Sequence, residues 1–130
     1  MKKKLFVGLC ALVLGVVSTS SLALANEKSK LLAKGMVKLS DAQVAKIKSG
    51  KTIKGVTVPK GVKWTNQYKA NGIKIATFKG KSHKRKWSYK GGEWCETSGK
   101  KMNCEIAHFK LGNQCYIFKD NGSVAHRFGC

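Results

Sequence analysis

The chain has 130 residues, which suits a single domain, and it carries 26 Lys and Arg residues against only 6 Asp and Glu residues. Its formal net charge of +20 attracts anionic partners and repels cationic ones. Six scattered acids offer little for catalysis by paired carboxylates, and no G-x-S-x-G, phosphate-loop or H-E-x-x-H motif is present, so the sequence argues against an enzyme.

Residues 1–25 have the features of a signal peptide. A cationic start at residues 2–4 precedes a 13-residue apolar run at 5–17, and the small residues of Ala23-Leu24-Ala25 follow. A membrane anchor is the alternative, but a spanning helix needs about 20 apolar residues. A lipoprotein is disfavoured because the bulky Leu9 precedes Cys10. We therefore expect cleavage before Asn26, which removes Cys10.

The expected mature chain is strongly basic and keeps four cysteines. Three of the 26 basic residues lie in residues 1–25, which leaves 23 against 6 acids and a net charge of +17. Export places the cysteines in an oxidising compartment, so we expect disulfides and a periplasmic or secreted protein.

The next segments predict an arm and a short helix. Residues 26–38 are polar and basic and are typical of an N-terminal arm or a weak helix. Ser40 with Gln43 has the pattern of a capping box, and Gly50 supplies a helix stop. We therefore expect one short N-terminal helix, followed by β structure, in a single domain over residues 39–130.

Alternating strands follow Gly50, and the pair Asn71-Gly72 favours a two-residue type I′ hairpin. In that hairpin Tyr68 faces Ile75, while Lys69 and Lys74 meet on the opposite side. Trp64, Trp87 and Trp94 are expected on the packed side of the sheet.

Regular turn signals between short strands predict a mainly β fold. We expect an antiparallel meander or barrel-like sheet of six to eight strands, stapled by disulfides. The predicted strands are residues 52–58, 63–70, 73–78, 84–89, 93–97, 102–109, 114–119 and 124–128.

Four mature cysteines allow three pairings, and the sequence alone does not choose among them. The hairpin register favours Cys95 with Cys104, which are equidistant from a turn near Gly99, and Cys115 with Cys130 across the Asn121-Gly122 turn. No C-x-x-C motif is present, so we expect no metal, cofactor or redox role.

The densest cationic segment predicts a polyanion-binding site. Lysines and an arginine beside aromatic residues combine attraction to phosphate with stacking surfaces. An alternative is a solvated loop with no specific partner. The expected partners are lipopolysaccharide, an anionic glycan, lipid or, nonspecifically, DNA. The candidate residues are Lys79, Lys81, Lys84, Arg85, Lys86 and Trp87.

Two histidines suggest a further alternative, a small secreted ribonuclease-like hydrolase. His108 and His126 would transfer protons, but an intervening strand separates them by roughly 9 to 10 Å. This activity would therefore require both histidine side chains to lie on the same face of the sheet. His83 is expected in a basic loop. A secreted toxin or antimicrobial protein is another alternative, although no contiguous cationic amphipathic helix is visible.

Several short motifs resemble a known family. They are Tyr68-Lys69-Ala70-Asn71-Gly72, Lys86-Trp87-Ser88-Tyr89, Trp94-Cys95-Glu96 and Lys119-Asp120-Asn121-Gly122, with a second cysteine at Cys104. In this order they resemble the bacterial secreted family grouped as domain of unknown function 995, over residues 36–128. The resemblance implies export and a β-rich fold and assigns no chemistry. The extra pair Cys115 and Cys130 departs from the family pattern.

Overall fold

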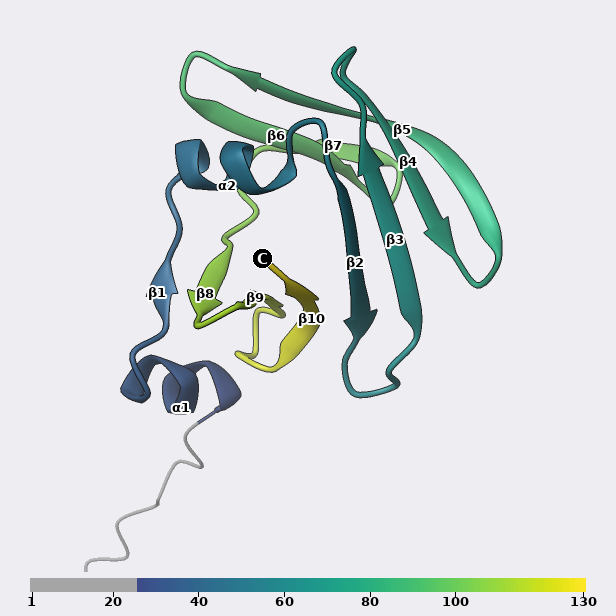
Figure 1. Cartoon of the computed structure of the whole chain (residues 1–130). Helices are drawn as coiled ribbons and strands as arrows, with labels where there is room; N and C mark the ends of the chain where they lie inside the picture. Colours follow the sequence, from purple (N-terminus) through teal and green to yellow (C-terminus); the bar gives the residue numbers. More distant parts are fainter. Residues whose placement is uncertain (1–25) are drawn as a thin grey trace, which may run out of the picture.

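A computed structural model of the chain describes residues 26–130, which form a curled antiparallel sheet and two short helices (Figure 1). The signal peptide predicted for residues 1–25 lies outside the described residues. Within residues 26–130, no helix is long and apolar enough to span a membrane.

The sheet contains ten strands in the order β1-β8-β9-β10-β2-β3-β4-β5-β6-β7. The helices are α1 (Glu27–Ala33) and α2 (Asp41–Lys48). The strands are β1 (Val37–Lys38), β2 (Thr52–Thr57), β3 (Lys63–Tyr68), β4 (Ile73–Phe78), β5 (Lys81–Lys90), β6 (Glu93–Ser98), β7 (Lys101–Asn103), β8 (Phe109–Leu111), β9 (Gln114–Phe118) and β10 (Val124–Gly129).

The mainly β, antiparallel class is confirmed, but the prediction of six to eight strands is wrong. Two differences account for ten strands. The short strand β1 lies in the segment expected to be an arm, and the single strand expected at residues 102–109 is divided into β7 and β8. Because β7 is an edge strand and β8 pairs near the other edge, residues 104–108 cross between them and cannot continue one strand.

Both helices begin at a side-chain cap. The predicted capping box starts α2: Gln43 N donates to Ser40 Oγ, and Ser40 N donates to Gln43 Oε1. The arm region also contains a helix, α1, whose first turn is capped by a bond from Ser29 N to Asn26 Oδ1. Figure 1 shows α2 across one end of the curled sheet and α1 near β8, β9 and β10 at the other end.

The predicted hairpin at Asn71-Gly72 has a different register. Tyr68 pairs with Lys74, not with the expected Ile75. Four residues form the turn, since Lys69 N donates to Ile73 O and Gly72 N donates to Lys69 O, with Gly72 at a φ of +81°. A one-residue shift moves side chains to the other face, so Lys74 joins Tyr68 on the packed side and does not meet Lys69 there.

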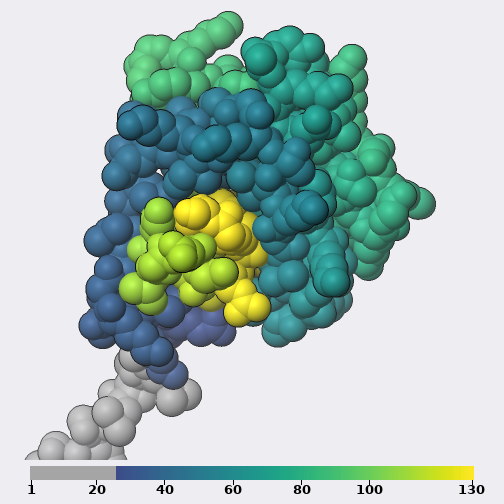
Figure 2. All heavy atoms as spheres, in the orientation of Figure 1, coloured from purple at the N-terminus to yellow at the C-terminus, as the bar shows by residue number. Residues whose placement is uncertain are grey.

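A small apolar core fills the space between α2 and the sheet. Trp94 of β6 is 2% exposed and stacks on Trp87, with ring centroids 5.2 Å apart. Trp64 and Trp87 are partly buried against this core, so all three tryptophans lie on the packed side. In the surface view of Figure 2, the atoms of β8 to β10 lie beside those of α2 and β2. The buried members are Leu39, Val44, Ala45, Ile53, Tyr68, Trp94, Cys115 and Phe128.

Two disulfides staple the sheet, with the pairing that the hairpin register favoured. Cys95 of β6 bonds to Cys104, and Cys115 of β9 bonds to Cys130. Disulfides persist in oxidising compartments, so this covalent pattern fits an extracellular or periplasmic setting.

Candidate functional site

The cationic segment lies mostly in strand β5, which begins at Lys81, three residues before the strand predicted at residues 84–89. Only Lys79 and Gly80 form the turn, and both have positive φ, as a two-residue type I′ hairpin requires. His83, expected in a loop, is also in this strand. Because strand side chains alternate, the six predicted residues do not form one surface.

Trp87 is not an exposed stacking platform. Its indole Nε1 donates to Lys69 O over 2.9 Å, and its ring stacks on buried Trp94. Lys81 and Arg85 share the face of Trp87, whereas Lys84 and Lys86 point to the other face of β5. The structure therefore separates the predicted polyanion-binding set into two groups.

The register defines the outer face, which is turned away from the core. Lys84 of β5 pairs with Ile75 of β4, which pairs with Gln67 of β3, so these side chains lie on the outer face. Thr77 of β4 and Ser82 of β5 lie on the same face, and their hydroxyl oxygens are 2.8 Å apart. We call the exposed cations of this face the outer basic face. Its members are Lys54, Lys63, Lys84, Lys86 and Arg127.

No acid lies near the outer basic face in the sequence of these strands. Between Asp41 and Glu93 the chain has 14 Lys and Arg residues and no Asp or Glu. Within residues 26–130 the two ion pairs both involve Glu96, and neither includes a member of the outer basic face. These cations are therefore solvated and free to meet an external anion.

The inner face of β3, β4 and β5, which is the side opposite the outer basic face, borders a groove of about 940 Å³. Inner-face residues of β3 to β5, such as Asn66, Ala76 and His83, contribute to its lining. Residues of β6, β9, β10 and the crossing segment 104–108 also line it, together with Lys28 of α1 and Asn103 of β7.

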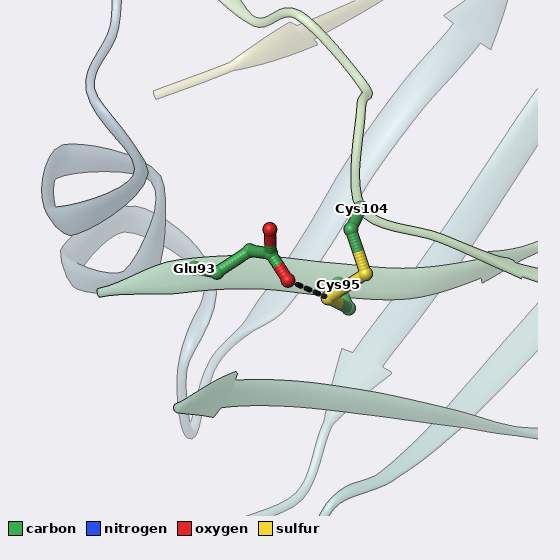
Figure 3. Close-up of side chains that lie close together, drawn as sticks. All are labelled: Glu93, Cys95 and Cys104. Atoms are coloured by element: carbon green, nitrogen blue, oxygen red, sulfur yellow. Dashed lines mark hydrogen bonds between the residues drawn. A yellow bond between two sulfur atoms is a disulfide. The ribbon is translucent and has the colours of Figure 1, made fainter. Parts of the chain in front are cut away.

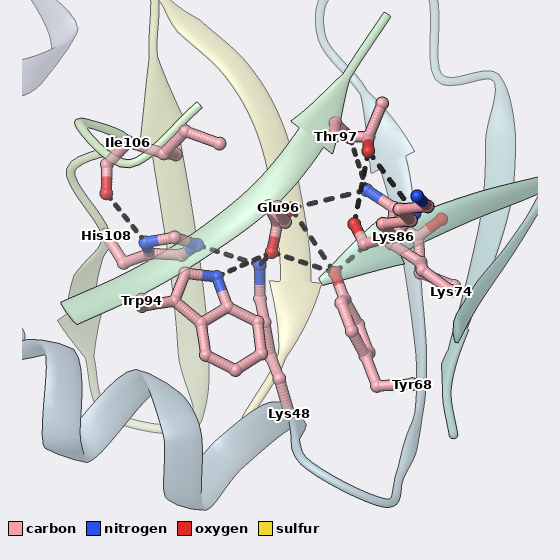
Figure 4. A network of polar contacts seen from close by, with 10 residues as sticks. Lys48, Tyr68, Lys74, Lys86, Trp94, Glu96, Thr97, Ile106 and His108 are labelled. Carbon is pink, nitrogen blue, oxygen red and sulfur yellow. Dashed lines mark hydrogen bonds and ion pairs between the residues drawn. The ribbon is translucent and has the colours of Figure 1, made fainter. Parts of the chain in front are cut away.

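A buried polar network around Glu96 lies where this groove meets the core (Figure 4). Glu96 Oε2 accepts from Lys48 Nζ at 2.9 Å and from Trp94 Nε1 at 2.8 Å, and Tyr68 donates its hydroxyl at 3.2 Å. Lys74 Nζ lies 3.6 Å from Oε1 and donates to Thr97 O. Every carboxylate oxygen is thus satisfied inside the protein.

Lys48 joins this network to His108. Its Nζ donates to His108 Nε2 over 2.8 Å, while His108 Nδ1 donates to Ile106 O over 3.0 Å. A carbonyl only accepts, so this arrangement fixes His108 as the neutral tautomer with its proton on Nδ1. The amino group of Lys48 also lies 5.4 Å from the ring centroids of both Tyr68 and Phe128.

Burial sets the direction of most pKa shifts here. It lowers the pKa of Lys48 and of Lys74 despite the attraction of Glu96. It lowers the pKa of His108 to about 4, and the charge of Lys48 adds to this effect. Burial alone would raise the pKa of Glu96, but Lys48 and Lys74 outweigh it and hold this pKa at about 2.

This geometry gives no support to proton transfer by the two predicted histidines. His108 is 2% exposed, and both of its ring nitrogens are engaged. His126 is half-buried with a pKa lowered by burial, and its ring packs edge-on against Trp64 at 5.7 Å. A general acid or base needs access to substrate and a pKa near the working pH, and His108 meets neither condition.

Glu93, Cys95 and Cys104 bring three metal-type ligand atoms together (Figure 3). The Glu93 Oε1 lies 3.5 Å from Cys95 Sγ. Both sulfurs are consumed by the disulfide, so neither has a proton to donate nor a thiolate charge to offer a cation. In the oxidised protein this group is structural.

Comparisons with known proteins add no relative. No protein-family model matches the chain, and searches of curated proteins and of solved structures find no similar sequence or fold. Kinship with the family of domain of unknown function 995 therefore stays a prediction.

Proposed function

We propose that this protein is an exported cationic module that attaches through its outer basic face to an anionic envelope polymer, lipid surface or extracellular polyanion. The observation that supports it is the absence of acids between Asp41 and Glu93, which leaves four exposed lysines of this face without an internal counter-charge. Arg127 of β10 adds a fifth exposed cation, which is also outside the ion pairs of the described residues.

Four of these five cations are lysines, and this composition sets the kind of binding. Lysine acts as a mobile point charge, so it attracts phosphate, sulfate or carboxylate polymers without fixing their geometry. Affinity then depends on the release of counterions and falls steeply with salt. Selectivity among polyanions is expected to be low. Export, which the two disulfides fit, brings such a protein to anionic envelope components.

The test replaces Lys54, Lys63, Lys84 and Lys86 together with Gln and measures binding to heparin, lipopolysaccharide vesicles and DNA. The matched control replaces Lys30, Lys34, Lys100 and Lys101, which are exposed on α1, its C-terminal end and the β6–β7 hairpin. Both variants lose the same charge, so a difference between them reports position.

The outer-face variant should bind more weakly than the control, and its plot of log affinity against log salt should be flatter by up to about 3 to 4 units. Equal loss in both variants would show that net charge acts without a site. Binding that does not change between about 50 and 500 mM salt would overturn the electrostatic mechanism.

A further inference from the structure

Arg85 presents an unpaired guanidinium to the inner groove. It is half-buried, lines the groove and pairs across the strands with Lys74. Its one hydrogen bond within residues 26–130 is a long contact of 3.4 Å from Nη1 to Lys84 O. A guanidinium carries five donors in a planar fork that fits a carboxylate or phosphate, so most of its capacity is unused.

No acid of the protein supplies the missing partner. Glu96, beside Lys74, is already saturated by Lys48, Trp94 and Tyr68. Glu105 and Asp120 also line the groove, but among the described residues neither forms an ion pair with Arg85. The groove thus holds a cation without its anion.

The rest of the lining combines charged and polar side chains with a group of apolar ones. Ala76, Phe78, Ile117, Phe118 and Ala125 all border the groove. Phe78 is 40% exposed, so its ring is accessible to a ligand in the groove, and the amino group of Lys79 lies 5.5 Å from its ring centroid. From Lys74 to Phe78 along β4 the groove runs about 13 Å, at ~3.3 Å per residue. An extended chain of ten to twelve carbons has a comparable length.

From this juxtaposition we propose that the inner groove binds a single-chain anionic amphiphile, with its carboxylate or phosphate head on Arg85 and its acyl chain along Ala76, Phe78 and Phe118. This site is separate from the outer basic face and goes beyond the polyanion attachment proposed above. A guanidinium and an aromatic wall recognise two parts of one ligand, whereas a free polyanion would use only the charge.

The experiment measures binding of dodecanoate and of dodecyl phosphate, below their micelle concentrations, by calorimetry and by amide shift mapping of the full mature protein. The variant Arg85→Gln is compared with Lys84→Gln. These residues are adjacent, lose the same charge and lie on opposite faces. Dodecyltrimethylammonium serves as the ligand of opposite charge.

Dodecanoate or dodecyl phosphate should shift residues of the groove, and Arg85→Gln should weaken binding about tenfold while Lys84→Gln changes it less than about twofold. The cationic amphiphile should bind the wild-type protein far more weakly. A preference between the two heads identifies a fatty acid or a phospholipid-type ligand, and either preference supports the site. The same comparison with phosphatidylglycerol vesicles distinguishes a soluble ligand from a membrane lipid.

Three outcomes would overturn the proposal. They are equal affinity for the cationic amphiphile, shifts confined to the outer face, or equal effects of Arg85→Gln and Lys84→Gln. If Arg85→Gln does not fold, the comparison of ligand charge and the shift map of the wild-type protein still decide. Failure here leaves heparin and lipopolysaccharide binding by the outer basic face untouched, so the two proposals fail separately.

Discussion

The amino group of Lys48 donates a hydrogen bond to Nε2 of neutral His108, 60 residues further along the chain, over 2.8 Å. Lys48 ends α2, and His108 ends the segment that crosses from one edge of the sheet to the other. The contact therefore ties the helix to the crossing segment. Leu39 N, which donates to His108 O over 2.8 Å, adds a second tie at the same residue.

The first prediction is that stability falls as the pH drops. The unfolded chain protonates at His108 near pH 6.5, whereas the folded protein does so only near its lowered pKa of about 4. The unfolded state thus binds more protons in this window, and the free energy of unfolding should fall by up to roughly 3 kcal/mol. Below pH 4.5, Glu96 adds a further loss as the pH approaches its pKa of about 2.

Urea unfolding at about pH 7, 5.5 and 4 measures this dependence. His108→Gln should be less stable at neutral pH but flatter between pH 6.5 and 4. The exposed His83→Gln control should keep the wild-type slope. A slope that persists in His108→Gln would assign the effect to other groups.

A second prediction concerns the ion pair of Lys48 and Glu96. Their side chains are 3% and 7% exposed. Glu96→Gln removes the charge that compensates two buried lysines, so it should cost about 3 to 5 kcal/mol. Lys48→Met should cost less, because Lys74, Trp94 and Tyr68 still contact Glu96. The double variant should be more stable than the sum of the single changes predicts, by about 1 kcal/mol or more. Additive effects would contradict direct coupling.

The sequence identified the scaffold better than it identified this network. The capping box of α2, the strand β4 and both disulfides follow from local patterns, because each depends on residues close in the chain. The network depends on charged residues at buried positions, and a charged residue is normally expected at the surface.

Signals for the network were nevertheless present. Lys48 is four residues from Val44, so it lies on the same side of the helix, and Glu96 is two residues from Trp94, so it shares a strand face with it. The sequence predicts the wrong face for Lys74, because Asn71-Gly72 favours a two-residue turn, whereas the turn before Lys74 spans residues 69–72. Asn71-Gly72 alone does not distinguish a two-residue loop from the observed turn, in which Gly72 has positive φ.

A third prediction concerns Gly55, where β2, β3 and β10 lie close together. A Cβ at this position would overlap the Trp64 ring and lie 2.6 Å from Arg127 O. Gly55→Ala should therefore destabilise the protein by about 1 to 3 kcal/mol. Gly129→Ala, where a Cβ meets nothing within 4 Å, is the matched control and should change stability little. Trp64→Leu in the Gly55→Ala background should recover only part of the loss, since the Arg127 carbonyl stays in place.

The last prediction orders the two disulfides. The Cys115–Cys130 bridge spans 15 residues, and Cys115 is fully buried in the core, whereas the Cys95–Cys104 bridge spans 9 residues. Replacing Cys115 and Cys130 with Ala should lower the free energy of unfolding by roughly 3 to 5 kcal/mol, and replacing Cys95 and Cys104 should lower it by roughly 2 to 3 kcal/mol. The first change should cost more because the longer loop restrains the unfolded chain more, and because it also removes volume from the core. Urea unfolding of both double variants measures this difference in stability. Mass spectrometry of the exported wild-type protein checks that both bridges form, and it should show a chain that starts at Asn26 and has no thiol open to alkylation. The reverse order of stability would mean that stapling the β6–β7 hairpin matters more than closing the sheet at its C-terminal strand.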